Sequence, residues 1–288
     1  LASARGSESR WAKGAPCGLV DGVPTTIKDV VLTKGWPTLR GSRTTDPHQS
    51  WEEDAPCTAR LREQGAVLLG KTTTPEFGWK GITDSALTGI TRNPWNTGRT
   101  PAGSSGGAAA AAALGLGALH IGTDGGGSIR MPAAFTGVFG HKPTFGRVPA
   151  WPSSAFGTLA HIGPIVRTVS DAALMLNVLT QPDHRDWFAI PPDGCDFTTG
   201  LDDGIAGLRI AYSPDLGHAD VDPEIAALVR SAVDVFVSLG AEVEEMDPGI
   251  GDTAEIFKRH WYSGAAAAVA EFSEDQQALM EPGLREVA

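Results

Sequence analysis

Cysteine is scarce in this sequence, and no cysteine pair has the spacing of a metal or redox motif. The three cysteines, Cys17, Cys57 and Cys195, are far apart among 288 residues. An odd number of scattered cysteines argues against a disulfide framework and against a thiolate zinc site. The first ten residues also lack the apolar core of a signal peptide. We therefore expect a cytoplasmic protein.

Positive charge is also in short supply. The chain has 23 Lys and Arg against 34 Asp and Glu, which gives a formal net charge of −11. A chain of this charge repels phosphate backbones, so we do not expect a nucleic acid partner. The apolar content of 41% is high enough to bury a large core. The composition predicts a soluble globular protein.

The sequence contains no strongly hydrophobic run of membrane-spanning length. Residues 100–123 carry no charged side chain, but they include Pro101 and six glycines, and most of the rest is alanine. Alanine and glycine contribute little transfer free energy compared with leucine, isoleucine or phenylalanine. We therefore expect a buried helix with flanking loops in this window, and no membrane span.

Strand-like and helical segments alternate along the chain. Lys28 lies at the end of a strand-like segment, and residues 54–64 and 66–69 read as a helix followed by a strand. A helix from Ser104 or Ser105 is followed by a strand at 118–122. This alternation predicts the α/β class, with a mixed, largely parallel central β-sheet flanked by α-helices on both faces.

The punctuation by proline, aspartate and glycine suggests where the chain divides. Residues 1–180 hold the glycine-rich motifs, and residues 181–204 read as a surface connection. Residues 205–288 form the more acidic remainder of the same domain, with a strand, a helix from Pro223 and a second strand. We expect this remainder to continue in a longer protein.

One motif matches a phosphate-binding pattern only formally. Residues 65–72, GAVLLGKT, fit GxxxxGK[ST]. The four variable residues favour a buried strand, however, and a phosphate loop must open directly into a helix. The residues after Lys71 are Thr-Thr-Thr-Pro, which make a poor helix. We expect a strand here.

A second motif fits the nucleophile elbow of α/β-hydrolases. Residues 103–107 satisfy GxSxG with Ser105 at the centre. The preceding residues 92–103 are turn formers where that fold requires a buried strand, and Asp171 follows His161 where it should precede it. This alternative is disfavoured and stays open.

A third pattern joins a lysine, a serine pair and a glycine turn. The three glycines before Ser128 allow successive N–H groups to converge on an oxyanion, beside a hydroxyl that can attack a carbonyl carbon. Lys28 can serve as the base if its pKa falls from ~10.4 to about 7 or 8, which requires roughly 4 kcal/mol. Ser104, placed between Lys28 and Ser128, could relay the proton.

These motifs closely resemble the amidase signature family. The resemblance rests on residues 101–149, which include PAGSSGGAAAAAALGLGALHIGTDGGGSIR, on GVPTTIKD at 22–29 and on HIGPIVRTVSDAA at 161–173. It implies a Ser-cisSer-Lys triad made of Lys28, Ser104 in a cis peptide, and the nucleophile Ser128. The implied activity is hydrolysis of a carboxylic acid amide through a Ser128 acyl-enzyme.

The resemblance also implies the surroundings of the triad. The amides of Gly125, Gly126, Gly127 and Ser128 would form the oxyanion hole. No metal or cofactor is expected, the expected partner is a small-molecule amide, and a homodimer is kept open. The residues implied to hold the loops in place are Ser105, Asp124 and Arg130.

Several points depart from the family pattern or stay open. Ala102 stands where the family often has glycine, and both ends look shorter than the family requires. An alternative function is the amidase subunit of a tRNA-dependent amidotransferase, although Phe77–Gly81 lacks the small and hydroxyl-rich residues typical of it. Another alternative is a scaffold without turnover. The aromatic residues that could line an acyl pocket, or belong to the core, are Trp79, Trp95, Trp151 and Phe156.

Overall fold

The computed structural model describes all residues, 1–288, and divides them into two compact units. The first comprises Leu1–Thr198 and His260–Ala288, and the second comprises Thr199–Arg259. All motifs singled out above for chemistry lie in the first unit. No helix combines the length and the apolar character that a membrane crossing requires.

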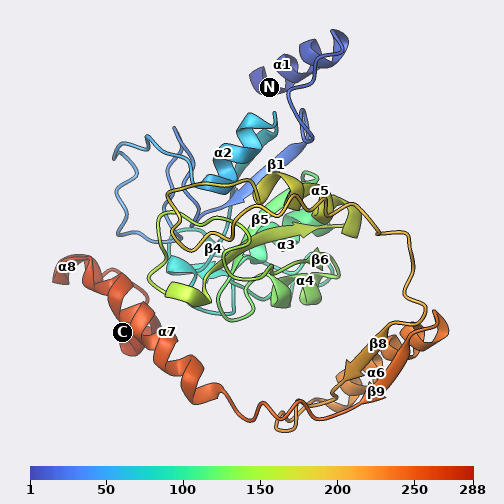
Figure 1. Ribbon diagram of the computed structural model, residues 1–288. Coiled ribbons are helices and arrows are strands. Elements are labelled where there is room, and N and C mark those ends of the chain that lie inside the picture. The colour runs from blue at the N-terminus through green and yellow to red at the C-terminus, as the bar shows by residue number, and fades with distance from the viewer. The chain divides into compact units, whose positions relative to one another are not determined.

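A five-stranded sheet forms the centre of the first unit (Figure 1). Its strand order is β2-β1-β5-β7-β6. The pairs β2/β1 and β1/β5 are parallel, whereas β7 is antiparallel to both β5 and β6, so β7 alone runs in the opposite direction. This confirms the expected mixed, largely parallel sheet. The strands are β1 (Pro24–Lys28), β2 (Val67–Thr72), β5 (Leu119–Asp124), β6 (Phe139–Gly140) and β7 (His161–Val166).

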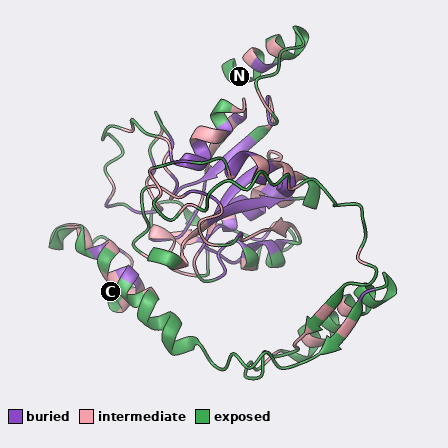
Figure 2. Cartoon of the chain, in the orientation of Figure 1, coloured by how far each residue is buried: buried purple, intermediate pink, exposed green.

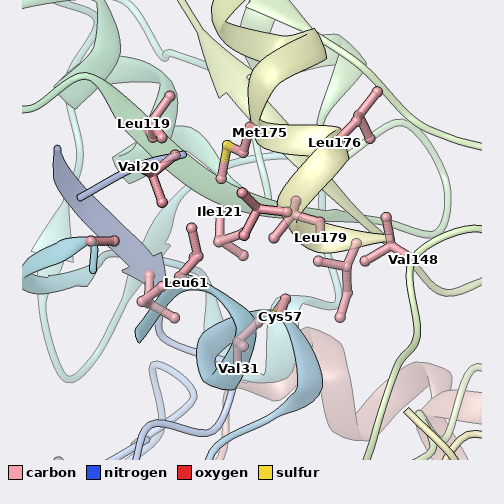
Figure 3. Close-up of a cluster of buried hydrophobic side chains, with 14 of the residues drawn as sticks. Val20, Val31, Cys57, Leu61, Leu119, Ile121, Val148, Met175, Leu176 and Leu179 are labelled. Carbon is pink, nitrogen blue, oxygen red and sulfur yellow. The ribbon is translucent and has the colours of Figure 1, made fainter. Parts of the chain in front are cut away.

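Helices cover both faces of this sheet, as the sequence predicted. Adjacent residues of a strand point to opposite faces, and the adjacent β7 residues Ile165 and Val166 belong to different apolar clusters. The larger cluster includes buried residues of α2 and α5 (Figure 3), and the smaller one includes alanines of α3. The helices involved are α2 (Pro56–Glu63), α3 (Gly106–Ala113), α4 (Arg130–Thr136) and α5 (Val169–Leu179).

The charge-free window forms α3 and β5, in agreement with the expected buried helix. The small side chains of α3 allow its backbone to approach neighbouring segments closely. A Cβ atom on Gly107 would lie 2.4 Å from the backbone nitrogen of Thr73, and one on Gly106 would lie 2.4 Å from Thr83 Oγ1. Glycine is therefore required at both positions, since a larger residue would displace the start of α3.

Segments at both ends of the first unit add to this sheet domain. Helix α1 (Ala2–Ala12), which the sequence analysis did not predict, is joined to Asp21 by an Arg10 ion pair and by a Trp11 Nε1–H bond of 3.0 Å to the Asp21 carbonyl oxygen. From His260 onward, α7 packs its Ala265 and Val269 against residues of the last helix. The remaining elements are η1 (Glu76–Gly78), β3 (Asp84–Ser85), β4 (Gly89–Ile90), η2 (Gly157–Leu159), α7 (Ala254–Ala270), α8 (Glu274–Gln277) and α9 (Pro282–Val287).

The second unit is a small βαβ arrangement. Strands β8 (Arg209–Tyr212) and β9 (Glu242–Glu245) pair in parallel and are connected by α6 (Pro223–Ser238). The Asp222 carboxylate caps α6 by accepting hydrogen bonds from the first backbone amides of the helix. Both strands and the proline-initiated helix agree with the sequence prediction. The predicted division at residues 181–204 stays a prediction.

The sheet brings the catalytic candidates to one edge. Lys28 is the last residue of β1 and Asp124 is the last residue of β5, and Ile27 pairs with Ile121 in the parallel ladder. The carboxyl ends of the two strands therefore lie side by side, which is where α/β sheets usually bind ligands. Figure 2 shows these central strands as the most buried part of the molecule.

The buried histidine His120 on β5 leads to a stability prediction. Its ring is fully buried, Nδ1 lies 2.8 Å from Thr26 Oγ1, and Nε2 has no hydrogen-bond partner. Burial and the positive charge of Arg167 lower the pKa of His120 to about 4. Because the pKa in the unfolded chain is about 6.5, stability is full above that pH and decreases as the pH falls toward 4. The expected loss between pH 7 and pH 5 is roughly 2 kcal/mol.

Urea unfolding at these two pH values tests this expectation. His120→Gln should show a smaller loss of unfolding free energy than the wild type between pH 7 and pH 5. His48→Gln, at an exposed histidine, should keep the wild-type dependence. An unchanged pH dependence in His120→Gln would contradict the assignment.

Candidate active site

The amine of Lys28 is surrounded by hydroxyl groups. The side chain is fully buried, and Nζ lies 2.7 Å from Ser104 Oγ, 2.9 Å from Ser105 Oγ and 2.8 Å from Thr123 Oγ1. An ammonium group has three N–H donors, so each would have one acceptor. No carboxylate is within ion-pair distance of Nζ, and Lys28 therefore has a polar but uncharged first set of partners.

Burial changes the acidity of this amine. It lowers the pKa of Lys28 to about 7, and the negative charge of Asp124 partly opposes the shift. A buried site disfavours the charged form of lysine because the protein solvates it less well than water does. Near neutral pH a substantial fraction of Lys28 is therefore uncharged and can accept a proton.

Ser104 lies at a turn with unusual backbone geometry. The Gly103–Ser104 peptide bond is cis, and Ala102 has a φ of 61°, in the left-handed region that favours glycine. This is the position at which the family often has glycine. The Ser104 side chain is buried and packs close to Gly78, where an added Cβ atom would lie 3.3 Å from Ser104 Oγ.

Ser105 makes structural hydrogen bonds with its hydroxyl group. Its Oγ–H donates to the Thr123 carbonyl oxygen (3.1 Å), while Oγ accepts from the Thr123 N–H (3.2 Å) and lies beside Lys28 Nζ. The Ser105 backbone N–H also donates to the carbonyl oxygen of Ser128, at 3.2 Å. These bonds join the start of α3 to the end of β5 and to the glycine turn.

The elbow alternative loses its support in this geometry. The single hydroxyl proton of Ser105 is directed to a backbone carbonyl, and its partner amine is Lys28 rather than a histidine. His161 Nδ1 lies 2.8 Å from the Leu159 carbonyl oxygen, so it donates there. Asp171 lies in the first turn of α5 and has no bond to His161. The two residues do not form a triad with Ser105.

The phosphate-loop alternative also loses its support. Residues 67–72 form the strand β2, and no helix follows Thr72 directly. The amine of Lys71 donates to the Val31 carbonyl oxygen and to the hydroxyls of Thr33 and Thr38. Lys71 therefore fastens the loop after β1, as a strand residue can do.

The glycine turn after β5 presents backbone amides and the Ser128 side chain together. Gly127 has a φ of 111°, which a residue with a side chain adopts only with strain. Its N–H donates to Asp124 Oδ1 at 2.8 Å. The structure gives no protein acceptor for the amides of Gly125, Gly126 and Ser128. The expected contribution of Gly127 to an oxyanion hole is therefore corrected, since its N–H is already engaged.

Asp124 and Arg130 hold this turn in shape. The Asp124 carboxylate accepts from the amides of Gly127, Ile129 and Arg130 and from two guanidinium nitrogens of Arg130. Burial alone would raise the pKa of Asp124, but these hydrogen bonds outweigh it and lower the pKa to about 2. The carboxylate is thus ionised at all physiological pH values.

A cavity of about 500 Å³ opens onto the site, and Ser104, Gly125 and Ser128 contribute to its wall. Of the four aromatic residues considered in the sequence, Trp151 and Phe156 line it. Trp79 packs in an apolar cluster instead, and Trp95 is 73% exposed on a surface loop, so it belongs neither to the pocket nor to the core. The aromatic residues of the wall are Phe77, Phe145, Trp151, Phe156, Phe188 and Trp261.

Two contributors were missed by the sequence analysis. Thr123 stands directly before Asp124 at the end of β5, so its position beside the glycine turn was a usable signal. Trp261 comes from α7 and belongs to no motif, so the sequence held no comparable signal for it. No group of three or more His, Cys, Asp or Glu side chains is gathered so that it could hold a metal ion.

Comparisons with known proteins agree with this geometry. A family model described as Amidase matches residues 1–285. An acylamidase of Rhodococcus erythropolis is 42% identical over 256 residues, which cover 88% of this chain and 54% of that protein. A glutamyl-tRNA(Gln) amidotransferase subunit of Chloroflexus aurantiacus is 43% identical over 242 residues, which cover 84% and 50%. The chain thus spans about half the length of these relatives.

Solved structures show the same similarity. A bacterial aryl acylamidase of the amidase signature family matches with a TM-score of 0.91 and 36% identity, over 99% of this chain and 61% of that chain. A 6-aminohexanoate cyclic dimer hydrolase complexed with substrate matches with a TM-score of 0.87 and 31% identity, over 99% and 61%.

Asp124 provides a test of what holds the turn. Asp124→Asn should lower the free energy of unfolding by about 2 kcal/mol, because the amide places N–H donors against backbone N–H groups and leaves the guanidinium without its counter-charge. The measurement is urea unfolding.

A matched control is Asp193→Asn, which removes the carboxylate of the half-exposed ion pair with Arg147. This substitution should change stability little, because exposed ion pairs contribute little. Equal effects of the two substitutions would contradict a special role for Asp124.

Proposed function

The chain belongs to the amidase signature family, and on that premise we propose that it hydrolyses a carboxylic acid amide to a carboxylate and ammonia or an amine. The proposed catalytic residues are Lys28, Ser104 and Ser128. The observation that carries the proposal is the fully buried Lys28 amine, 2.7 Å from Ser104 Oγ, at the wall of a cavity that Ser128 also lines. Residues 1–180 would hold this machinery.

The hydrogen bonds of Lys28 fit a base in both of its protonation states. In the neutral form the amine has two N–H groups and one lone pair. Ser105 already directs its proton to Thr123, so Ser105 must accept one of the N–H groups. If Thr123 accepts the other, the lone pair faces the hydroxyl proton of Ser104. After protonation all three hydroxyl oxygens are acceptors of the ammonium group.

The proposed reaction then proceeds in two halves. Ser128 Oγ attacks the amide carbon while its proton passes to Ser104 and the proton of Ser104 passes to Lys28. The tetrahedral intermediate collapses as the proton returns through Ser104 to the leaving nitrogen, and an acyl-enzyme remains. Water repeats the sequence and releases the carboxylate. No metal or cofactor enters these steps.

The negative oxygen of the intermediate needs donors that are already in place. The amides of Gly125, Gly126 and Ser128 are proposed for this role, because they lie in the turn that carries the nucleophile and Asp124 fixes that turn. Preorganised donors of this kind typically contribute about 10²–10³-fold to the rate. The Gly127 amide contributes indirectly, through its bond to Asp124.

The substrate proposal is a small amide with an apolar acyl group. Six aromatic side chains line the cavity, and such walls favour apolar groups over charged ones. The similarity to the glutamyl-tRNA(Gln) amidotransferase component supports a second candidate, in which the amide is glutamine and further protein components are needed. Comparing turnover of an aryl or alkyl amide with turnover of glutamine separates the two.

Ser128 is tested by covalent labelling. A fluorophosphonate probe should label wild-type protein at Ser128, and Ser128→Ala should lose both labelling and amide turnover. Ser170→Ala, at an exposed serine of α5, should keep both. Mass-spectrometric mapping of the label to Ser105 would instead contradict the proposed nucleophile.

Lys28 is tested by the pH dependence of kcat/KM. Because the neutral amine is the active form and its pKa is about 7, kcat/KM should fall about tenfold per pH unit below pH 7 and level off above pH 8. Lys28→Arg should lose nearly all turnover, since a guanidinium group keeps its proton. A wild-type profile that is flat between pH 5 and pH 8 would remove Lys28 from the role of base.

A further inference from the structure

Trp261 on α7 packs directly against the glycine turn. A Cβ atom added to Gly125 would lie 3.0 Å from Cζ3 and 3.5 Å from Cη2 of the Trp261 indole. The ring therefore occupies the space beside the Gly125 backbone and leaves no room for a side chain there. This contact joins a residue outside every sequence motif to the turn that carries Ser128.

The indole is held on its other sides. Its Nε1–H donates to the Trp79 carbonyl oxygen at 3.0 Å. Its ring stacks on Phe156, with centroids 4.3 Å apart and an interplanar angle of 27°. Gly264, one turn further along α7, permits this packing, because a Cβ atom there would lie 2.5 Å from Phe156 Cδ1. Trp261 is thus fixed between Phe156 and Gly125.

From this arrangement we propose that Trp261 is a positioning residue for the oxyanion-binding amides. The proposal rests on the proposed amidase function. Glycine backbones have wide conformational freedom, so the turn at Gly125 and Gly126 needs an external support to present its amides in one orientation. Asp124 supports the turn from within by its bond to Gly127. Trp261 supports the opposite end, at Gly125.

The geometry of Gly125 makes this support testable. Its φ lies outside the left-handed region, so alanine fits the backbone there. The nearest atoms to the added Cβ belong to Trp261, and the next, the Leu159 carbonyl oxygen, is at an ordinary contact distance of 3.6 Å. The cost of Gly125→Ala should therefore arise from the indole. Removing the indole should remove that cost.

The experiment is a double-mutant cycle on kcat and KM for one amide substrate, with turnover expressed per fluorophosphonate-labelled site. Trp261→Ala should lower kcat about 30-fold with KM changed less than about threefold, because misplaced donors weaken transition-state binding. Trp261→Phe keeps a ring but loses the N–H donor, and should lie between. Gly125→Ala should be impaired in the wild-type background and should cost nothing more in the Trp261→Ala background.

Trp11 offers a matched control, since its Nε1–H also donates to a backbone carbonyl oxygen at 3.0 Å, in α1. Trp11→Phe should leave kcat and KM unchanged. A Trp261→Ala variant with raised KM and wild-type kcat, or additive costs in the cycle, would overturn the positioning role while leaving the amidase proposal intact. A wild-type protein that neither hydrolyses amides nor is labelled at Ser128 would overturn both.

Discussion

A lysine amine that is removed from water must find its hydrogen-bond partners within the protein. Lys28 finds three, the hydroxyls of Ser104, Ser105 and Thr123. The partners come from two segments more than seventy residues away in the sequence. The end of β1, the start of α3 and the end of β5 must therefore meet. The remainder of the first unit holds these three segments together.

The sheet and the small residues of α3 make this meeting compatible with close packing. Parallel pairing of Ile27 with Ile121 aligns the ends of β1 and β5. Glycines at 106 and 107 then allow α3 to start within contact distance of Thr83 and Thr73. A bulkier residue at either glycine would move Ser105 away from Lys28. The glycine-rich sequence is thus a packing requirement as well as a turn signal.

Two neighbouring serines have different parts to play in this arrangement. Ser105 directs its proton to a backbone carbonyl, which leaves its oxygen as an acceptor for Lys28. Ser104 contacts Lys28 and also lines the cavity. A serine pair in a sequence gives no reason to assign these parts. They follow from which hydroxyl has a carbonyl oxygen within reach, and that is a tertiary contact.

The aromatic residues show where sequence reasoning stops. Trp151 and Phe156 line the cavity, Trp95 lies on the surface, and Trp261 reaches the glycine turn from a distant helix. All four are large apolar residues, and none is marked by spacing or motif. The walls of a cavity are assembled from several elements, so the pattern within one element cannot say which aromatic side chains meet there.

The sequence by itself determined the α/β class, the strand that ends in Lys28 and the glycine turn before Ser128, because these depend on neighbours along the chain. Only the tertiary structure decided the pKa of Lys28, the engagement of the Gly127 amide and the contact of Trp261 with Gly125. Each of these arises from burial or from contact between distant segments. Such effects exist only after the chain has packed, since an extended chain leaves all these groups in water.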